Sequence, residues 1–193
     1  MAKLYFRYGT VGSAKTLNLL AVAHNYQQQG KKVLLVKPAL DTRFGFAHIR
    51  SRAGLEKPAD VLLHPDSVLP FADFEACDCL LVDEAQFLSP AVIDQLREVT
   101  RRLKVPVICY GLRTDFRTHL FEGARRLLEI ADAIEEIKTT CNFCNRKAIF
   151  NLKFLNGQPS LEGPTIDLGA EEKYLPACHA CYWSQLGLDE NSA

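Results

Sequence analysis

Residues 9–16, GTVGSAKT, decide the fold of this chain. They match the phosphate-binding pattern GxxxxGK[ST] at Gly9, Lys15 and Thr16, but Ala14 replaces the second glycine. Residues 2–9 (AKLYFRYG) form a short apolar run typical of a strand. After the loop, TLNLLAVAHNYQQQG has apolar residues at helical spacing and ends at a glycine. Strand, loop and helix are the context in which backbone N–H groups point at a bound phosphate.

The chemistry of this loop needs three kinds of group. Consecutive backbone N–H groups wrap a polyphosphate, a lysine reaches the β- and γ-phosphates, and a hydroxyl ligates magnesium. An alanine is tolerated in place of the glycine if its φ angle stays negative. The residues predicted to bind nucleotide here are Gly9, Thr10, Val11, Gly12, Ser13, Ala14, Lys15 and Thr16.

Three further apolar runs have the length of strands. They are KKVLLVKP (31–38), CLLVDEAQF (79–87) and VPVICYGL (105–112), and their continuous apolar character is typical of strands buried on both faces of a parallel sheet. Helices are predicted between or after them. SPAVIDQLREVTRRL has Ser89 as N-cap and Pro90 at the first helical position, and residues 120–133, LFEGARRLLEIADA, form another helical pattern. The sequence therefore predicts an α/β fold, a parallel sheet with flanking helices and the phosphate loop at the carboxyl end of its first strand.

Acidic residues follow the second of the strong strands. Asp83 and Glu84 end CLLVDE, where one acid can support Mg²⁺ and its neighbour can activate an attacking group. In LDTRFG, Asp41 and Arg43 could meet metal or phosphate, although a surface turn explains them equally well.

The segment after the third strand, CYGLRTDFRTHLF, lies where a parallel sheet binds ligands. Leu112, Phe116 and Phe121 could hold a flat base there by stacking, or could simply pack in the core. Arg113 and Arg117 are expected to face solvent or phosphate.

Four of the seven cysteines form two CxxC pairs, CNFC and CHAC, separated by 33 residues. Four thiolates from two such knuckles suit tetrahedral Zn²⁺, and a fully coordinated zinc has a structural role. Two disulfides are the alternative, and His179 could replace one ligand. Cys77, Cys79 and Cys109 lie in or beside apolar stretches and are expected to be buried thiols. The predicted zinc ligands are Cys141, Cys144, Cys178 and Cys181.

The character of the sequence changes near Thr140. Residues 147–159, KAIFNLKFLNGQP, alternate like strands around a turn at Asn156 and Gly157. We therefore predict two domains, a nucleotide-binding α/β domain over residues 1–139 and a small zinc-binding domain over residues 140–193.

Composition excludes some classes of partner. The chain has 193 residues and a formal net charge of zero, so no global field recruits nucleic acid or an anionic membrane. The N-terminus lacks the features of a secretory signal, and no apolar run approaches the ~18 residues that a membrane span needs. A cytoplasmic location without a membrane or nucleic-acid partner is expected.

Taken together, these motifs resemble the type II thymidine kinases of bacteria and animal cytosol. The resemblance covers nearly the whole chain and rests on YGTVGSAKT, DTRFG, LVDEAQFL, CYGLRTDF and EEKYLPACHACY, in family order and spacing. It implies transfer of the γ-phosphoryl of ATP to the 5′-hydroxyl of thymidine, with Mg²⁺ and a structural Zn²⁺, in a homotetramer.

The resemblance also implies roles for individual residues. Glu84 would accept the 5′-hydroxyl proton, Lys15 and Thr16 would hold phosphate and Mg²⁺, and Asp83 would support the metal. Arg43 would steady phosphate, with Asp41 close to the metal and sugar. The segment between the zinc knuckles would form a lasso over the base, in which residues 165–174 supply backbone groups to thymine. The walls of the thymine pocket would be Val11, Leu112, Phe116, Phe121, Gly169 and Tyr174.

Three positions depart from the family pattern: Ala14 replaces the loop glycine, Val11 replaces a common methionine, and Gly169-Ala170 replaces two glycines. Two other functions therefore stay open. One is an ATPase that acts on nucleic acid through a zinc ribbon, which the unremarkable charge of the zinc segment disfavours. The other is a regulatory protein that binds nucleotide at a catalytically weakened loop.

Overall fold

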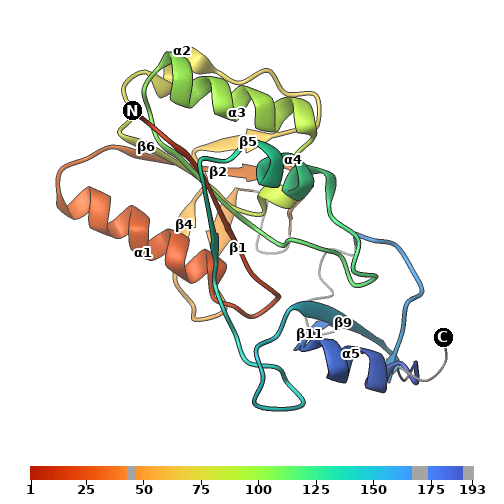
Figure 1. The fold of residues 1–193 in the computed structure, drawn as a ribbon. Helices are drawn as coiled ribbons and strands as arrows, with labels where there is room; N and C mark the ends of the chain where they lie inside the picture. The colour runs from red at the N-terminus through yellow and green to blue at the C-terminus, as the bar shows by residue number, and fades with distance from the viewer. Residues whose placement is uncertain (43–46, 167–173, 189–193) are drawn as a thin grey trace.

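The computed structural model describes residues 1–42, 47–166 and 174–188, and all structural statements below concern these residues. Figure 1 shows a central sheet with helices on both faces and a smaller lobe that contains β9, β11 and α5. Among the described residues, no helix combines the length and the apolar character that crossing a membrane requires.

The central sheet has six parallel strands in the order β5-β2-β6-β7-β1-β8. This arrangement confirms the predicted parallel α/β fold. The four strands predicted from apolar runs are the central ones, and the sequence missed the two edge strands because each is short and only partly buried. The strands are β1 (Leu4–Tyr8), β2 (Val33–Pro38), β5 (Val61–Leu63), β6 (Cys79–Val82), β7 (Val107–Gly111) and β8 (Ala133–Glu136).

Side chains of the central strands alternate between two hydrophobic cores. In β6, Leu80 and Val82 belong to the core under α3 and α4, whereas Leu81 belongs to the core under α1. Because successive residues of a strand point to opposite faces, a continuous apolar run requires cover on both sides. The helices supply that cover: α1 (Lys15–Gln28) on one face, and α3 (Pro90–Arg102) and α4 (Glu122–Ile130) on the other (Figure 1).

Helix ends follow the predicted signals, with one exception. The Ser89 hydroxyl accepts a hydrogen bond from the Val92 N–H at 3.4 Å, and Gly30 follows α1 at a φ of 72°. The exception is the helix predicted over residues 120–133, which is too long at its C-terminal end because α4 ends at Ile130. Asp132 instead bonds to β1: its N–H donates to the Leu4 carbonyl and its carboxylate accepts from the Leu4 N–H, both at 2.8 Å. Pairing with β1 thus draws this stretch into β8.

Two short elements lie at the carboxyl edge of the sheet. A hairpin of β3 (His48–Arg50) and β4 (Glu56–Pro58) follows β2, and a 3₁₀ turn (Ala85–Phe87) follows β6. A further short helix, α2 (Phe71–Phe74), precedes β6.

The C-terminal lobe, by which we mean residues 140–166 and 174–188, has its own antiparallel sheet in the order β10-β9-β11. The predicted turn is present, since Asn156 and Gly157 have φ angles of 51° and 78° and join β9 to β10. The second CxxC pair opens a helix that the sequence did not indicate. The elements are β9 (Phe150–Leu155), β10 (Gln158–Pro159), β11 (Tyr174–Ala177) and α5 (His179–Gln185). A division into independent domains at residue 139 stays a prediction.

Candidate active site

The phosphate loop connects β1 to α1 and is tightly packed. A Cβ atom on Gly9 would lie 2.3 Å from the Ser13 hydroxyl and 2.5 Å from the Ile137 carbonyl, so this position requires glycine. The Lys15 ammonium donates to the Thr10 carbonyl at 2.7 Å and lies 3.5 Å from the Ser13 hydroxyl. The loop therefore curls around the lysine, which places this cation at the position where a polyphosphate would sit.

Ala14 has a φ of 62° and a ψ of 28°, which is the left-handed region. The condition under which alanine would fit without strain, a negative φ, is therefore not met. An alanine in this conformation costs about 1 kcal/mol relative to glycine. The strain does not disrupt the helix start, because the Asn18 N–H still donates to the Ala14 carbonyl at 2.9 Å.

Thr16, in the first turn of α1, meets Asp83, the residue that follows β6. The Thr16 hydroxyl lies 3.1 Å from one carboxylate oxygen of Asp83 and 3.4 Å from the other. A hydroxyl and a carboxylate beside a phosphate loop are the oxygen donors that Mg²⁺ takes in phosphoryl-transfer sites, so these two residues fit that ion.

Glu84 lies between β6 and the 3₁₀ turn in a strained backbone conformation with a φ of 49° and is 9% exposed. The buried Gln86 side chain holds it, because its Nε2 donates to Glu84 Oε2 at 2.6 Å. The other end of the same amide accepts from the Leu112 N–H at 2.9 Å, which fixes its orientation. Gly111 leaves room for this contact, since a Cβ there would lie 2.5 Å from Gln86 Oε1. Backbone strain at an acid held in this way is typical of functional sites.

Asp41 is 4% exposed and pairs with the buried Lys37 ammonium at 3.3 Å. Lys37 also donates to the His48 carbonyl at 3.0 Å, which ties the end of β2 to the β3–β4 hairpin. Asp41 therefore belongs to the cavity wall rather than to a surface turn. Arg43, the predicted phosphate-binding arginine, lies outside the described residues. Arg52 from the hairpin lines the same cavity and was not predicted.

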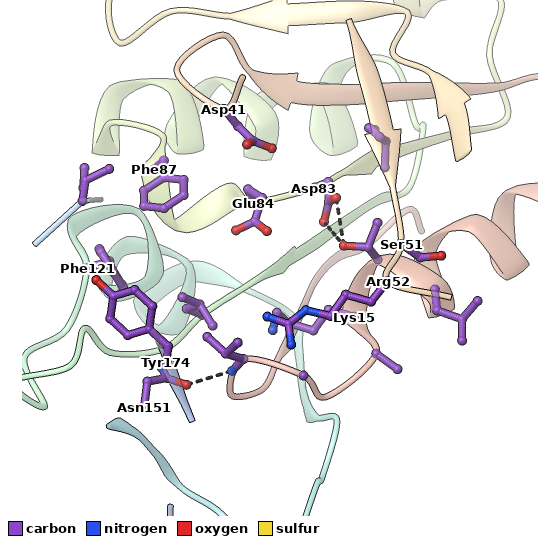
Figure 2. A pocket seen from close by; sticks show the side chains of 18 of the residues that line it. Lys15, Asp41, Ser51, Arg52, Asp83, Glu84, Phe87, Phe121, Asn151 and Tyr174 are labelled. Atoms are coloured by element: carbon purple, nitrogen blue, oxygen red, sulfur yellow. Dashed lines mark hydrogen bonds between the residues drawn. The ribbon is translucent and has the colours of Figure 1, made fainter. Parts of the chain in front are cut away.

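These groups surround one cavity of about 280 Å³. Figure 2 shows that Asp83, Lys15 and Arg52 lie toward one end, that Phe121 and Tyr174 lie toward the other, and that Glu84 lies between. Leu112 and Phe116 also line the cavity, together with Val11, whereas Gly169 lies outside the described residues. Thr165 and Ile166, the first two residues of the segment expected to reach the base, line the cavity as well. Lining residues that the sequence did not single out include Ser51, Arg52, Phe87, Thr114, Asp115 and Asn151.

Asn151 connects the C-terminal lobe to the phosphate loop. Its side-chain oxygen accepts from the Val11 N–H at 2.8 Å (Figure 2), and its amide group donates to the Thr114 carbonyl at 3.2 Å. The residue is 4% exposed and is the second residue of β9. An asparagine between the apolar Phe150 and Leu152 is the signal that could have identified it, because a buried amide must find partners.

The four paired cysteines converge in the C-terminal lobe. Their sulfur atoms all lie within 4.8 Å of one another, and Cys144 Sγ is 3.6 Å from Cys178 Sγ, too far for a disulfide. Four sulfurs around a zinc ion at about 2.3 Å would be roughly 3.8 Å apart, so the cluster fits Zn²⁺. His179 is directed elsewhere, accepting from the Trp183 indole N–H at 3.2 Å.

Neighbouring cysteines of this cluster shift the pKa values of Cys141 and Cys181. Although burial opposes ionisation of Cys141, hydrogen bonds from the backbone lower its pKa to about 7. The neighbouring Cys178 and Cys144 thiols raise the pKa of Cys181 to about 12. A dication favours the thiolate form of all four cysteines, so metal binding would remove the opposition between the lowered pKa of Cys141 and the raised pKa of Cys181.

Comparison with known proteins gives a consistent result. A family model described as "Thymidine kinase" matches residues 2–182. A thymidine kinase of Streptococcus pyogenes serotype M3 is 44% identical over 186 residues, which cover 95% of this chain and 98% of that protein. A thymidine kinase of Lactiplantibacillus plantarum is 43% identical over 185 residues, covering 95% and 96%. Among solved structures, a Pif1 helicase from Candida albicans has a TM-score of 0.44 and 11% identity, over 70% of this chain and 36% of its own, a likeness that carries no functional information.

Proposed function

The chain belongs to the thymidine kinase family, and we propose that it transfers the γ-phosphoryl group of ATP to the 5′-hydroxyl of thymidine. The observation that carries this proposal is the position of Glu84, between a cationic end of the cavity and an aromatic end (Figure 2). A phosphoryl donor at the first end and a nucleoside at the second would meet at this carboxylate.

In the proposed reaction, the Glu84 carboxylate accepts the proton of the 5′-hydroxyl. That oxygen forms a bond to the γ-phosphorus, the bond to the bridging oxygen breaks, and ADP leaves with the electron pair. Gln86 holds the carboxylate in place at 2.6 Å. Because such a transfer depends mainly on positioning and charge stabilisation, a fixed base and a fixed cation are the contributions this chain can make.

The cationic end would bind the triphosphate. Lys15 would move from the Thr10 carbonyl to the phosphates, while the loop N–H groups and Arg52 add positive potential. Thr16 and Asp83 would hold Mg²⁺, which supplies charge neutralisation when bound. Arg43 and Asp41 stay predicted contributors to this end.

The aromatic end would bind the base. Phe121, Phe116 and Tyr174 supply flat surfaces for stacking, and Leu112 and Val11 add apolar contact. A neutral base needs no charged partner, so the predicted backbone contacts from residues 165–174, including Gly169, agree with the chemistry of this wall. The four cysteines would hold a zinc ion that fixes both ends of that segment.

Three further properties are proposed with the reaction. A homotetrameric assembly follows from the family resemblance, whereas a cytoplasmic location and the absence of a nucleic-acid partner follow from the composition and the balanced charge of the chain. None of the seven cysteines, all of which lie in the described residues, forms a disulfide, which agrees with a reducing compartment.

The test is a coupled assay with ATP, Mg²⁺ and thymidine, with Glu84→Gln beside the parent. We expect thymidine monophosphate from the parent and a turnover at least about 10²-fold lower in the variant, because the proton acceptor is lost. ATP hydrolysis that is stimulated by DNA and independent of nucleoside would instead support the nucleic-acid ATPase. Tight ATP binding without product in the parent would support a regulatory protein.

A further inference from the structure

Two cations hold the segment that reaches from the C-terminal lobe to the cavity. The segment is residues 161–166, which we call the loop stem, and its last two residues, Thr165 and Ile166, line the cavity. All six of its residues are exposed, and none belongs to a helix or strand. Apolar burial therefore contributes little to its position, so its conformation must be fixed by polar contacts.

Arg117 makes three contacts to the stem. Its guanidinium donates to the Leu161 carbonyl at 2.9 Å, to the Gly163 carbonyl at 2.5 Å and to the Thr165 hydroxyl at 3.3 Å. The sequence predicts a side chain that faces solvent or phosphate rather than the core; Arg117 is half-buried, and its guanidinium binds this segment. The rigid planar fork of arginine suits a grip on several acceptors at once.

Lys153 binds the same segment from β9. Its ammonium is 2% exposed and donates to the Glu162 carbonyl at 3.1 Å. Three consecutive carbonyl groups of the stem thus accept from two cations. In the part of the chain that the structure describes, hydrogen bonds from other elements to the stem come from these two side chains.

The same cations also contact two aromatic walls of the cavity. Arg117 Cζ and Lys153 Nζ lie 4.5 Å and 4.7 Å from the centre of the Phe116 ring. Lys153 Nζ is 6.0 Å from the Tyr174 ring centre, and Tyr174 pairs directly with Lys153 across β11 and β9. Attraction between a cation and an aromatic face is strong when the cation is desolvated. One pair of cations therefore ties the stem to both rings.

We infer that Arg117 and Lys153 are positioning residues that determine nucleoside affinity by fixing the loop stem against Phe116 and Tyr174. Neither side chain lines the cavity, so neither acts on the reacting atoms. This inference rests on the proposed function, because it assigns the aromatic end of the cavity to the nucleoside.

The experiment compares three methionine substitutions, which remove a charge and its donors and keep an apolar side chain. Arg117→Met and Lys153→Met test the inference, and we call this pair of cations the clamp. Lys147→Met is the matched control, because Lys147 also lies in the C-terminal lobe but forms an exposed ion pair with Glu136 at 2.6 Å. Steady-state kinetics give KM for thymidine, KM for ATP and kcat, amide hydrogen exchange follows residues 161–166, and zinc content reports the integrity of the lobe.

We expect each clamp variant to raise KM for thymidine about tenfold, since a charged hydrogen bond is lost. KM for ATP should stay within about twofold, zinc content should be unchanged, and exchange in the stem should accelerate. The control should match the parent throughout. A thymidine KM within twofold of the parent in Arg117→Met, or equal rises in both KM values, would overturn the inference.

Two complications are covered by this design. If the buried Lys153→Met variant fails to fold, the partly exposed Arg117→Met still decides the question. If the parent makes no thymidine monophosphate, the proposed function fails, and the exchange measurement still tests the clamp: unchanged exchange in the stem of Arg117→Met contradicts it.

Discussion

The two ends of the cavity are built in different ways. The cationic end is called the phosphate end and the aromatic end the nucleoside end, after their proposed ligands. At the phosphate end, the groups follow β1 and β6, two strands that flank β7 in one sheet, and a close-packed backbone fixes them. At the nucleoside end, the walls come from the segment after β7, from β9, from the loop stem and from β11. The first end depends on the order of strands in a sheet, and the second on contacts between a lobe and that sheet.

This difference predicts which perturbations should affect nucleoside binding without affecting ATP binding. A sheet with two buried faces opens only when the core unfolds, whereas a small lobe with a four-cysteine cluster and an exposed stem held by two cations can loosen by itself. Nucleoside binding should therefore be the more easily lost of the two, and four predictions test that asymmetry.

Zinc removal should have the largest effect. Chelation should raise KM for thymidine by more than about 30-fold and leave nucleotide binding and the main thermal transition nearly unchanged, because the metal supplies much of the folding energy of such a lobe. Nucleoside binding, ATP binding and circular dichroism would be followed during chelator titration. Simultaneous loss of both ligands and of the core would remove the distinction between the ends.

Gln86→Leu should lower kcat about tenfold with little change in either KM, because Glu84 loses the hydrogen bond that orients it. It should also destabilise the protein by about 1–3 kcal/mol, since the Leu112 N–H loses its acceptor. Steady-state kinetics and denaturant unfolding separate the two effects.

Gln86→Glu is the matched control, because it keeps an acceptor for Leu112 and loses the donor to Glu84. The added negative charge should raise the pKa of Glu84. A base must be deprotonated, so the acidic limb of the pH–kcat profile should move to higher pH. An unshifted profile would contradict the role of Glu84 as the base.

Asn151→Ala should raise both KM values about threefold to tenfold, because this side chain joins the phosphate loop to the segment after β7. That result would contrast with Arg117→Met, which should affect thymidine alone. Binding of ATP and thymidine measured separately by calorimetry checks it. A change confined to thymidine would mean that the phosphate end is independent of the lobe.

Ala14→Gly should have the smallest effect on function. Release of the left-handed strain should stabilise the protein by about 1 kcal/mol and change turnover less than about threefold. Thermal unfolding measures the stability, and the kinase assay measures the turnover. Asn156→Gly is the control, because Asn156 has a φ of 51° in an exposed turn and asparagine tolerates this conformation. A large rise in turnover from a nearly inactive parent would mean that Ala14 weakens the natural loop.

Sequence patterns singled out residues that line both ends of the cavity, and they missed Arg52 at one end and Asn151 in β9. The loop, Asp83 and Glu84 were found because each follows an apolar strand within a few residues, and parallel strands bring their carboxyl ends together. Edge strands β5 and β8, helix α5 and the β3–β4 hairpin were missed, since short and half-exposed segments carry weak periodicity. The roles assigned to the site residues stay predictions that the experiments above address.

The sequence by itself determined the family, the parallel α/β architecture and a four-cysteine cluster, because local spacing encodes strands, loops and metal knuckles. Only the tertiary structure shows the partners of Asn151, Gln86, Arg117 and Lys153. Each of these side chains forms hydrogen bonds with residues that the fold or a turn of the chain brings close to it, and no local sequence pattern specifies such contacts. The left-handed conformation of Ala14 belongs to the same class, since packing of the loop between β1 and α1 imposes a backbone angle that alanine does not itself prefer.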